Sequence, residues 1–371
     1  QKEDYYTQLL LSNINYYKNI LCKNSNWKIL KKLINNYELL NIVLYYKNQS
    51  IVYYKPLSRS FYKLWEIIYD YNILNINNLT NTKNINVFCM AEAPGGFIDA
   101  FMKVFYNKKY HNYTLDAISL IEKNTNIPTW NYIYNKIKYH NNINIIEYNN
   151  GDLYKTDTIK YCVNYCKKNN KKYDIITADG GFDFSNDYEN QELSFTKLFY
   201  SEVLTAISLQ KEGGTFICKC FDLNILLTQK ILYILYILYD NIIFTKPSIS
   251  RITNSEKYII AKGFKGIDKN ILEKFYNILD KWDNNLNYNL PQNYINNINK
   301  INHHYLLKEY ECYKMLDQLN NNLNETKIKQ LIKTQISKST LFCKKYHLSV
   351  NLNSDFLILT LEELYNKYYK N

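Results

Sequence analysis

Short apolar runs alternate with segments of helical periodicity between about residues 51 and 265. The apolar runs that we predict as strands are 85–91, 114–121, 143–147, 173–179, 214–220, 241–245 and 257–262. The helical patterns between them cover 60–71, 96–106, 127–138, 155–168, 192–210 and 224–239. Such alternation is typical of βα units that build a mainly parallel sheet. The last two strands are joined by a loop too short for a crossover helix, so we expect them to be antiparallel.

These patterns predict an α/β Rossmann-like fold, with a seven-stranded, mostly parallel sheet, its last strand antiparallel, and helices on both faces. The flanks are richer in Asn and Lys and show looser helical periodicity. We therefore divide the chain into an N-terminal helical extension (1–50), a central domain (51–265) and a C-terminal helical extension (266–371). Within the last part, the Asn-rich segment 292–304 is expected to be a loop.

Composition limits the partners and the cellular setting. The chain has 371 residues and a formal net charge of +12, an excess that favours polyanionic partners such as nucleic acid. We find no run of about 20 uninterrupted apolar residues and no signal peptide, so we expect a soluble, intracellular protein without a membrane partner. The eight cysteines follow no regular framework and lack the companions of a zinc site, so no metal is expected. The chain starts at Gln1, so the true N-terminus is expected to be missing.

Three charged residues lie at the ends of predicted strands, and glycines mark special turns. Asp179, Lys219 and Glu256 stand at such strand ends, where a carboxylate, an amine and a second carboxylate form a reaction centre more plausibly than a core. With only 9 glycines in the chain, the Pro94-Gly95-Gly96 turn stands out. It joins a strand to a helix in VFCMAEAPGGFIDAF (87–101), where backbone N–H groups can receive a nucleotide-like ligand.

The glycine turn resembles the A-x-P-G-G-[FW] motif of FtsJ-like (RrmJ-type) ribose 2′-O-methyltransferases that use S-adenosylmethionine. The resemblance implies that the cofactor is bound by Glu92, Ala93, Pro94, Gly95, Gly96, Phe97, Glu122, Asp152 and Asp179. One departure is Cys89, which stands where the family usually has Asp; Glu92 is the candidate to replace that carboxylate. For Glu122 the alternative is a solvated surface residue, and for Asp152 a turn residue that stabilises its own backbone.

A second motif supplies a fourth charged residue. Residues 58–67 resemble the R-x-x-[FY]-K-L-x-E-I segment that opens FtsJ-like domains and contribute Lys63. The resemblance then implies a catalytic tetrad of Lys63, Asp179, Lys219 and Glu256. In that reading Lys219 deprotonates or orients the 2′-hydroxyl, Asp179 and Glu256 hold the lysines and the substrate, and Lys63 tunes the charge. An unperturbed lysine is almost fully protonated at neutral pH and becomes a base only through burial or a second cation.

The motifs around the tetrad narrow the resemblance to mRNA cap 2′-O-methyltransferases of eukaryotes and large DNA viruses. The carrying stretches are DGGF (179–182), FICK (216–219) with FDL (221–223), and Lys246-Pro247 followed by NSEKY (254–258). The implied partner is capped RNA, with Arg59, Lys197, Lys246 and Arg251 as candidates to contact its phosphates. The alternative for each is ordinary surface charge.

Three readings of the function stay open. The first is a cap 2′-O-methyltransferase, located in a cytoplasmic viral factory or a nucleus. The second is an rRNA or tRNA 2′-O-methyltransferase. The third is a catalytically silent RNA-binding subunit of the same fold, which the full tetrad argues against and Cys89 favours. In each case the helical flanks are candidates to contact the cap or a partner protein.

Overall fold

The chain forms two compact units. The computed structural model describes residues 2–42, 49–75, 83–122, 127–181 and 191–370. One unit, the sheet unit, comprises Pro56–Pro247 and Glu256–Asn299. The other, the helical unit, comprises Gln1–Lys55, Ser248–Ser255 and Lys300–Asn371. The division of the chain at residues 50 and 265 into a central domain and two extensions stays a prediction.

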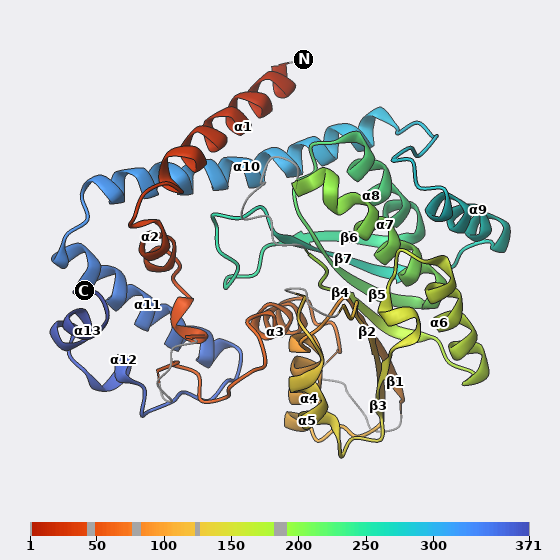
Figure 1. Cartoon of the computed structure of the whole chain (residues 1–371), viewed down its shortest axis with the longest axis horizontal. Helices are drawn as coiled ribbons and strands as arrows, with labels where there is room; N and C mark the ends of the chain where they lie inside the picture. The colour runs from red at the N-terminus through yellow and green to blue at the C-terminus, as the bar shows by residue number, and fades with distance from the viewer. Residues whose placement is uncertain (1, 43–48, 76–82, 123–126, 182–190, 371) are drawn as a thin grey trace. The chain divides into compact units, whose positions relative to one another are not determined.

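A seven-stranded sheet forms the centre of the sheet unit, in the spatial order β3-β2-β1-β4-β5-β7-β6 (Figure 1). The strands are β1 Ile85–Met90, β2 Tyr113–Ile118, β3 Ile143–Ile146, β4 Tyr173–Ala178, β5 Gln210–Cys220, β6 Tyr239–Thr245 and β7 Lys257–Phe264. Neighbours from β3 to β5 pair in parallel, whereas β7 is antiparallel to both β5 and β6. The predicted mostly parallel sheet with an antiparallel pair at its end is therefore confirmed.

Helices cover both faces of this sheet (Figure 1). They are α3 Ser60–Asp70, α4 Gly96–Asn107, α5 Asn131–Ile137, the short 3-10 helix η3 Tyr148–Gly151, α6 Thr156–Lys168, α7 Gln191–Leu209, α8 Leu226–Leu238 and α9 Lys269–Asp280. Because both faces are covered, the strands are nearly continuous apolar runs; Val87, Phe88, Ile176 and Ile217 are all fully buried. The core thus lies along the sheet and leaves the strand ends for polar groups.

The helical unit confirms that the flanks are helical. Its helices are α1 Lys2–Leu21, α2 Trp27–Leu33, the 3-10 helix η1 Glu38–Leu40, most of α10 Gln292–Asn321, α11 Glu325–Lys345, α12 Asp355–Ile358 and α13 Leu361–Tyr368. Leu21, Leu30 and Leu316 belong to one buried cluster of this unit. The Gln335 amide, on α11, donates hydrogen bonds to the carbonyls of Lys32, Leu33 and Asn35 at the end of α2. This contact joins α11 to the end of α2, where the helix leaves carbonyl groups available for such bonds.

The Asn-rich segment 292–304 is helical, so its prediction as a loop was wrong. It forms the first half of α10, in which Tyr294, Ile298, Asn302 and Leu306 are buried at intervals of four residues. Burial of one face stabilises a helix even where the intrinsic propensity of Asn is poor. Although α10 is 30 residues long, neither it nor any other described helix is apolar enough to cross a membrane.

Candidate active site

The four residues of the predicted tetrad all belong to the sheet unit, and the strand directions bring them to one edge of the sheet. Lys63 lies in the first turn of α3, Asp179 directly follows β4, and Lys219 is the second-last residue of β5. Glu256 directly precedes β7, which runs opposite to β5. The start of β7 therefore meets the carboxyl ends of β4 and β5, where ligands of open α/β sheets bind.

The tetrad side chains form a connected charge cluster. The Lys219 Nζ lies 3.0 Å from Asp179 Oδ1 and 3.9 Å from Glu256 Oε2, and it donates a 2.9 Å hydrogen bond to the Asp179 carbonyl. The Lys63 Nζ lies 2.6 Å from Glu256 Oε1. Glu256 therefore bridges both ammonium groups. Each of the four side chains is between 10% and 13% exposed, so solvent screens these charges weakly.

Burial and neighbouring charges shift the ionisation of this cluster. Burial lowers the pKa of Lys219, but the carboxylates of Asp179 and Glu256 outweigh it, so the pKa of Lys219 is raised. Burial raises the pKa of Glu256, but Lys63 and Lys219 reverse this effect, so the pKa of Glu256 is lowered. In this state the lysine is an ammonium ion and the glutamate is a carboxylate.

Tyr258 completes the cluster and was not among the residues predicted from the sequence. Its hydroxyl donates a 2.5 Å hydrogen bond to Asp179 Oδ1, and its ring lies 6.0 Å from the Lys63 Nζ and 6.1 Å from the ring of Phe97. Burial, followed by the Asp179 carboxylate, raises the pKa of Tyr258 well above its usual value. A signal was available, because residues two apart in a strand share a face and Tyr258 follows Glu256 at that interval.

The glycine turn between β1 and α4 needs glycine at two positions. Gly95 has a φ of +109°, in the left-handed region that favours glycine. A Cβ on Gly96 would lie 2.0 Å from the Ser60 Oγ and 2.1 Å from the Ser58 Oγ. The segment 58–60 at the start of α3 is therefore packed directly against the predicted cofactor turn.

Glu92 lies inside this turn with one oxygen engaged and one without a partner. Its Oε1 accepts a hydrogen bond from the Phe97 N–H in the first turn of α4. Its Oε2 is buried and has no hydrogen-bond partner within the described part of the chain. Burial, then the nearby Asp179 carboxylate, raises the pKa of Glu92 well above its usual value. An unpartnered buried carboxyl oxygen fits a cationic ligand group such as the methionine ammonium, so the residues present fit S-adenosylmethionine. The Cys89 side chain, by contrast, is fully buried in β1.

The two other predicted cofactor carboxylates lie after β2 and β3. Glu122 is an exposed residue that follows β2. The Asp152 Oδ1 accepts a 2.9 Å hydrogen bond from the Tyr154 N–H, which is the turn role considered as its alternative. These two segments meet, because the Ile121 N–H donates to the Asn150 carbonyl at 2.8 Å. Both carboxylates therefore lie at the same edge of the sheet as the tetrad.

The four predicted RNA-contacting cations have different surroundings. Arg59 directly precedes α3, one turn before Lys63. Lys197, on α7, lies 4.7 Å from the ring centre of Tyr154. Lys246 donates a 2.7 Å hydrogen bond to the Glu256 carbonyl, so it supports the tetrad backbone. Arg251 belongs to the helical unit, where it forms a 2.8 Å salt bridge with Glu38.

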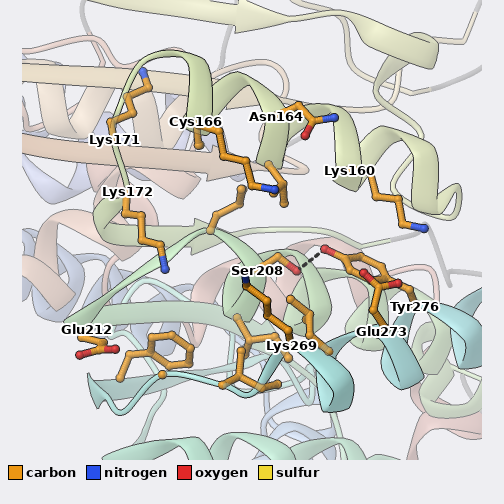
Figure 2. A pocket seen from close by; sticks show the side chains of 18 of the residues that line it. Lys160, Asn164, Cys166, Lys171, Lys172, Ser208, Glu212, Lys269, Glu273 and Tyr276 are labelled. Atoms are coloured by element: carbon orange, nitrogen blue, oxygen red, sulfur yellow. Dashed lines mark hydrogen bonds between the residues drawn. The ribbon is translucent and has the colours of Figure 1, made fainter.

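A cavity of about 890 Å³ lies away from these residues (Figure 2). Its charged lining comprises Lys160, Lys167, Lys171, Lys172, Lys269, Glu212 and Glu273. It is closed on one side by α9, where the Tyr276 hydroxyl is hydrogen-bonded to the Ser208 hydroxyl at 2.8 Å (Figure 2). Because Lys172 directly precedes β4, the cavity lies at the amino ends of the parallel strands, opposite to the tetrad edge. No predicted site residue lines it, so it is not part of the candidate reaction centre.

Comparisons with known proteins agree with this geometry. The family model described as FtsJ-like methyltransferase matches residues 56–264, which is more than half of the chain. A probable methyltransferase, EP424R of African swine fever virus, is 28% identical over 217 residues, covering 52% of this chain and 47% of that protein.

Two similar proteins carry cap-specific names. The cap-specific mRNA (nucleoside-2′-O-)-methyltransferase 1 of Trypanosoma brucei brucei is 37% identical over 127 residues, or 34% of each chain. Its counterpart in Bos taurus is 35% identical over 122 residues, covering 32% of this chain and 15% of that protein. In each case the match spans less than half of the relative. Among solved structures, human methyltransferase-like protein 13 in complex with SAH is similar at 11% identity and a TM-score of 0.36, covering 63% of this chain and 96% of that one.

Proposed function

Because the chain belongs to the FtsJ-like methyltransferase family, we propose that it methylates the ribose 2′-hydroxyl of a cap-proximal nucleotide in mRNA, with S-adenosylmethionine as the methyl donor. The relatives named as cap-specific mRNA methyltransferases support the choice of a capped substrate. The observation that carries the proposal is the Lys219 ammonium, held between Asp179 and Glu256 at the carboxyl edge of the sheet.

The reaction needs a positioned acceptor and a place for one proton. The 2′-hydroxyl oxygen forms a bond to the methyl carbon, the bond from that carbon to sulfur breaks, and the hydroxyl proton leaves. Lys219 is the candidate to orient the hydroxyl and to take its proton, which requires the neutral amine. Lys63 forms an ion pair with the other oxygen of the Glu256 carboxylate. This second cation limits how strongly Glu256 stabilises the ammonium form of Lys219.

The donor side is formed by the glycine turn. S-adenosylmethionine supplies an activated methyl group on a sulfonium centre when it is bound. We assign its binding to the turn from Glu92 to Phe97, with the unpartnered Glu92 Oε2 facing the methionine ammonium. The carboxylates of Glu122, Asp152 and Asp179 are the further candidates, because all three follow strands that end at this edge.

The substrate side is assigned to cations near the same edge. Arg59 and Lys197 are proposed to contact RNA phosphates, which position the strand without reading its sequence. Lys246 acts on this side through the Glu256 backbone. Arg251 and the helical flanks of the chain are proposed to contact the cap or a partner protein.

Labelled methyl transfer to three short RNAs tests the proposal. The RNAs are capped, uncapped, and capped with the first ribose already 2′-O-methylated. If the first nucleotide is the target, we expect label on the capped RNA and on neither of the other two. If the second nucleotide is the target, we expect label on both capped RNAs and none on the uncapped RNA. Equal transfer to the uncapped RNA would favour an rRNA or tRNA methyltransferase and would refute the cap-dependent function. If the wild-type protein binds neither S-adenosylmethionine nor SAH, the product that remains after methyl transfer, the reading as a catalytically silent RNA-binding subunit is favoured.

A matched pair of lysine variants tests the role of Lys219. Lys219→Ala should abolish transfer while SAH still binds, because the cofactor turn lies on other elements. Lys211→Ala is the control, since Lys211 stands in the same strand and also pairs with an aspartate that belongs to β4, Asp174, at 2.8 Å. That pair lies at the opposite end of the strand and should be dispensable. Activity that survives in Lys219→Ala contradicts the assigned role.

A further inference from the structure

Glu202 is a buried carboxyl group beside the tetrad that the proposed chemistry does not yet use. It lies in the middle of α7, in the sequence FYSEVLTAI, and its exposed fraction is 0%. A carboxyl group in an apolar helix face is unfavourable unless it has a specific partner. It was not predicted from the sequence, although a lone acidic residue in an otherwise uncharged stretch of the helix was a usable signal.

The partner of Glu202 is the backbone next to Asp179. Its Oε1 accepts a 3.2 Å hydrogen bond from the Gly180 N–H, whereas its Oε2 has no hydrogen-bond partner among the described residues. This approach requires a glycine, because a Cβ on Gly180 would lie 2.2 Å from Glu202 Oε1. Glycine at position 180 and glutamate at position 202 are thus one steric pair.

The same peptide unit also contacts Lys219. The Gly180 N–H and the Asp179 carbonyl belong to one planar peptide group, and that carbonyl accepts the 2.9 Å hydrogen bond from the Lys219 Nζ. Glu202 therefore holds the N–H side of this peptide group, and Lys219 contacts its carbonyl side. If the Glu202 acceptor is lost, the peptide is free to turn and its carbonyl no longer faces the lysine.

Glu202 also acts on the lysine by its charge. Among the described residues, the titratable groups that interact with it electrostatically are Lys219 and Cys218 from β5, Asp179 after β4, and Tyr154 after η3. Burial raises the pKa of Glu202 to about 8, with Lys219 opposing the rise. When Glu202 is ionised, its carboxylate stabilises the ammonium form of Lys219.

We propose that Glu202 is a positioning residue of the reaction centre, which orients the Asp179–Gly180 peptide toward Lys219 and sets how readily Lys219 loses its proton. This inference rests on the proposed methyl transfer. It assigns Glu202 no contact with substrate or donor; its effect reaches the reaction only through the peptide and the lysine.

Two variants separate the two parts of this role. Glu202→Gln keeps an acceptor oxygen for the Gly180 N–H and removes the charge. The limiting kcat at high pH should therefore change little, whereas the rising limb of the kcat–pH profile should move to lower pH. Glu202→Leu removes the acceptor, so kcat should fall roughly tenfold or more at unchanged KM for RNA. Thr205→Val is the control, because Thr205 is fully buried one turn further along α7 and its hydroxyl donates a hydrogen bond within that helix, to the Ser201 carbonyl.

The outcomes are decisive even if one variant fails to fold. An unshifted pH limb in folded Glu202→Gln refutes the effect of charge, and an unchanged kcat in folded Glu202→Leu refutes the orienting role. Loss of SAH binding in Glu202→Gln would show a structural role and also overturn the inference. If the wild type methylates no RNA, the proposed function fails. The inference is then judged by NMR: the titration of the Lys219 side chain should move in Glu202→Gln, and hydrogen exchange of the Gly180 amide should become faster in Glu202→Leu.

Discussion

Replacing Glu202 by glutamine should stabilise the sheet unit relative to wild type by more at neutral pH than in acid. The folded state raises the pKa of this carboxyl from 4.5 to about 8, mainly through burial. Between these values the unfolded chain releases a proton that the folded chain retains. The folded state then binds more protons than the unfolded state, so the free energy of unfolding falls as the pH rises through this window. Glutamine does not titrate and should remove this slope.

The size of the effect follows from the shift. Each pH unit inside the window is worth about 1.4 kcal/mol for one group, so between pH 5 and pH 7.5 wild type should lose up to about 3 kcal/mol relative to Glu202→Gln. Above pH 8 the difference should become constant, because both states are then ionised. The amide of glutamine has its own burial cost, but that cost does not vary with pH. It cancels when the two proteins are compared across the pH range.

Urea unfolding at pH 5, 6, 7 and 8 measures this difference. Wild type, Glu202→Gln and the Thr205→Val control are compared by their extrapolated free energies of unfolding, provided that their m-values agree. Thr205→Val should follow the pH dependence of wild type, since it retains the carboxyl group. A difference between wild type and Glu202→Gln that is the same at pH 5 and pH 8 would mean that Glu202 titrates at an ordinary pKa, and the reasoning from burial would be wrong.

Two further predictions concern the ligands of the proposed reaction. Glu92→Gln should weaken SAH binding roughly tenfold in calorimetry, because glutamine cannot become the carboxylate that pairs with the amino-acid ammonium of SAH. Folding should change little, since the amide oxygen can still accept a hydrogen bond from the Phe97 N–H. Unchanged affinity would place that ammonium elsewhere. Lys197→Glu should weaken RNA binding and reduce its dependence on salt concentration, because a phosphate contact releases a counterion, whereas an unchanged salt slope would mark Lys197 as ordinary surface charge.

The sheet could be predicted because its strands are buried on both faces. Such strands are apolar runs separated by helical periodicity, and β1, β4 and β7 begin within one residue of their predicted starts. The tetrad was accessible for a related reason, since charged residues at strand ends interrupt apolar runs and belong to recognisable motifs. The antiparallel direction of β7 brings these residues together, and the loop before β7, which is too short for a crossover helix, already indicated that direction.

The parts that sequence reasoning missed depend on contacts between distant segments. Glu202 accepts a hydrogen bond from the Gly180 N–H, which lies 22 residues earlier in the chain. No local sequence pattern predicts this contact. The prediction of a loop over 292–304 failed for a similar reason. Its Asn-rich composition favours a loop locally, and only the burial of residues such as Tyr294 and Ile298 reveals the helical face.

The pairing of β5 with β7 has a consequence for how the chain can vary in length. Lys219 lies directly opposite Tyr258, and the next pair along, Cys220 with Lys257, points to the other face of the sheet. One inserted or deleted residue in β7 that shifted this pairing by one position would turn Tyr258 away from Lys219 and carry Glu256 out of reach of both lysines. The register of β7 against β5 thus fixes the positions of Glu256 and Tyr258 relative to Lys219. Insertions and deletions that preserve the reaction centre are therefore expected in segments that are not paired in the sheet.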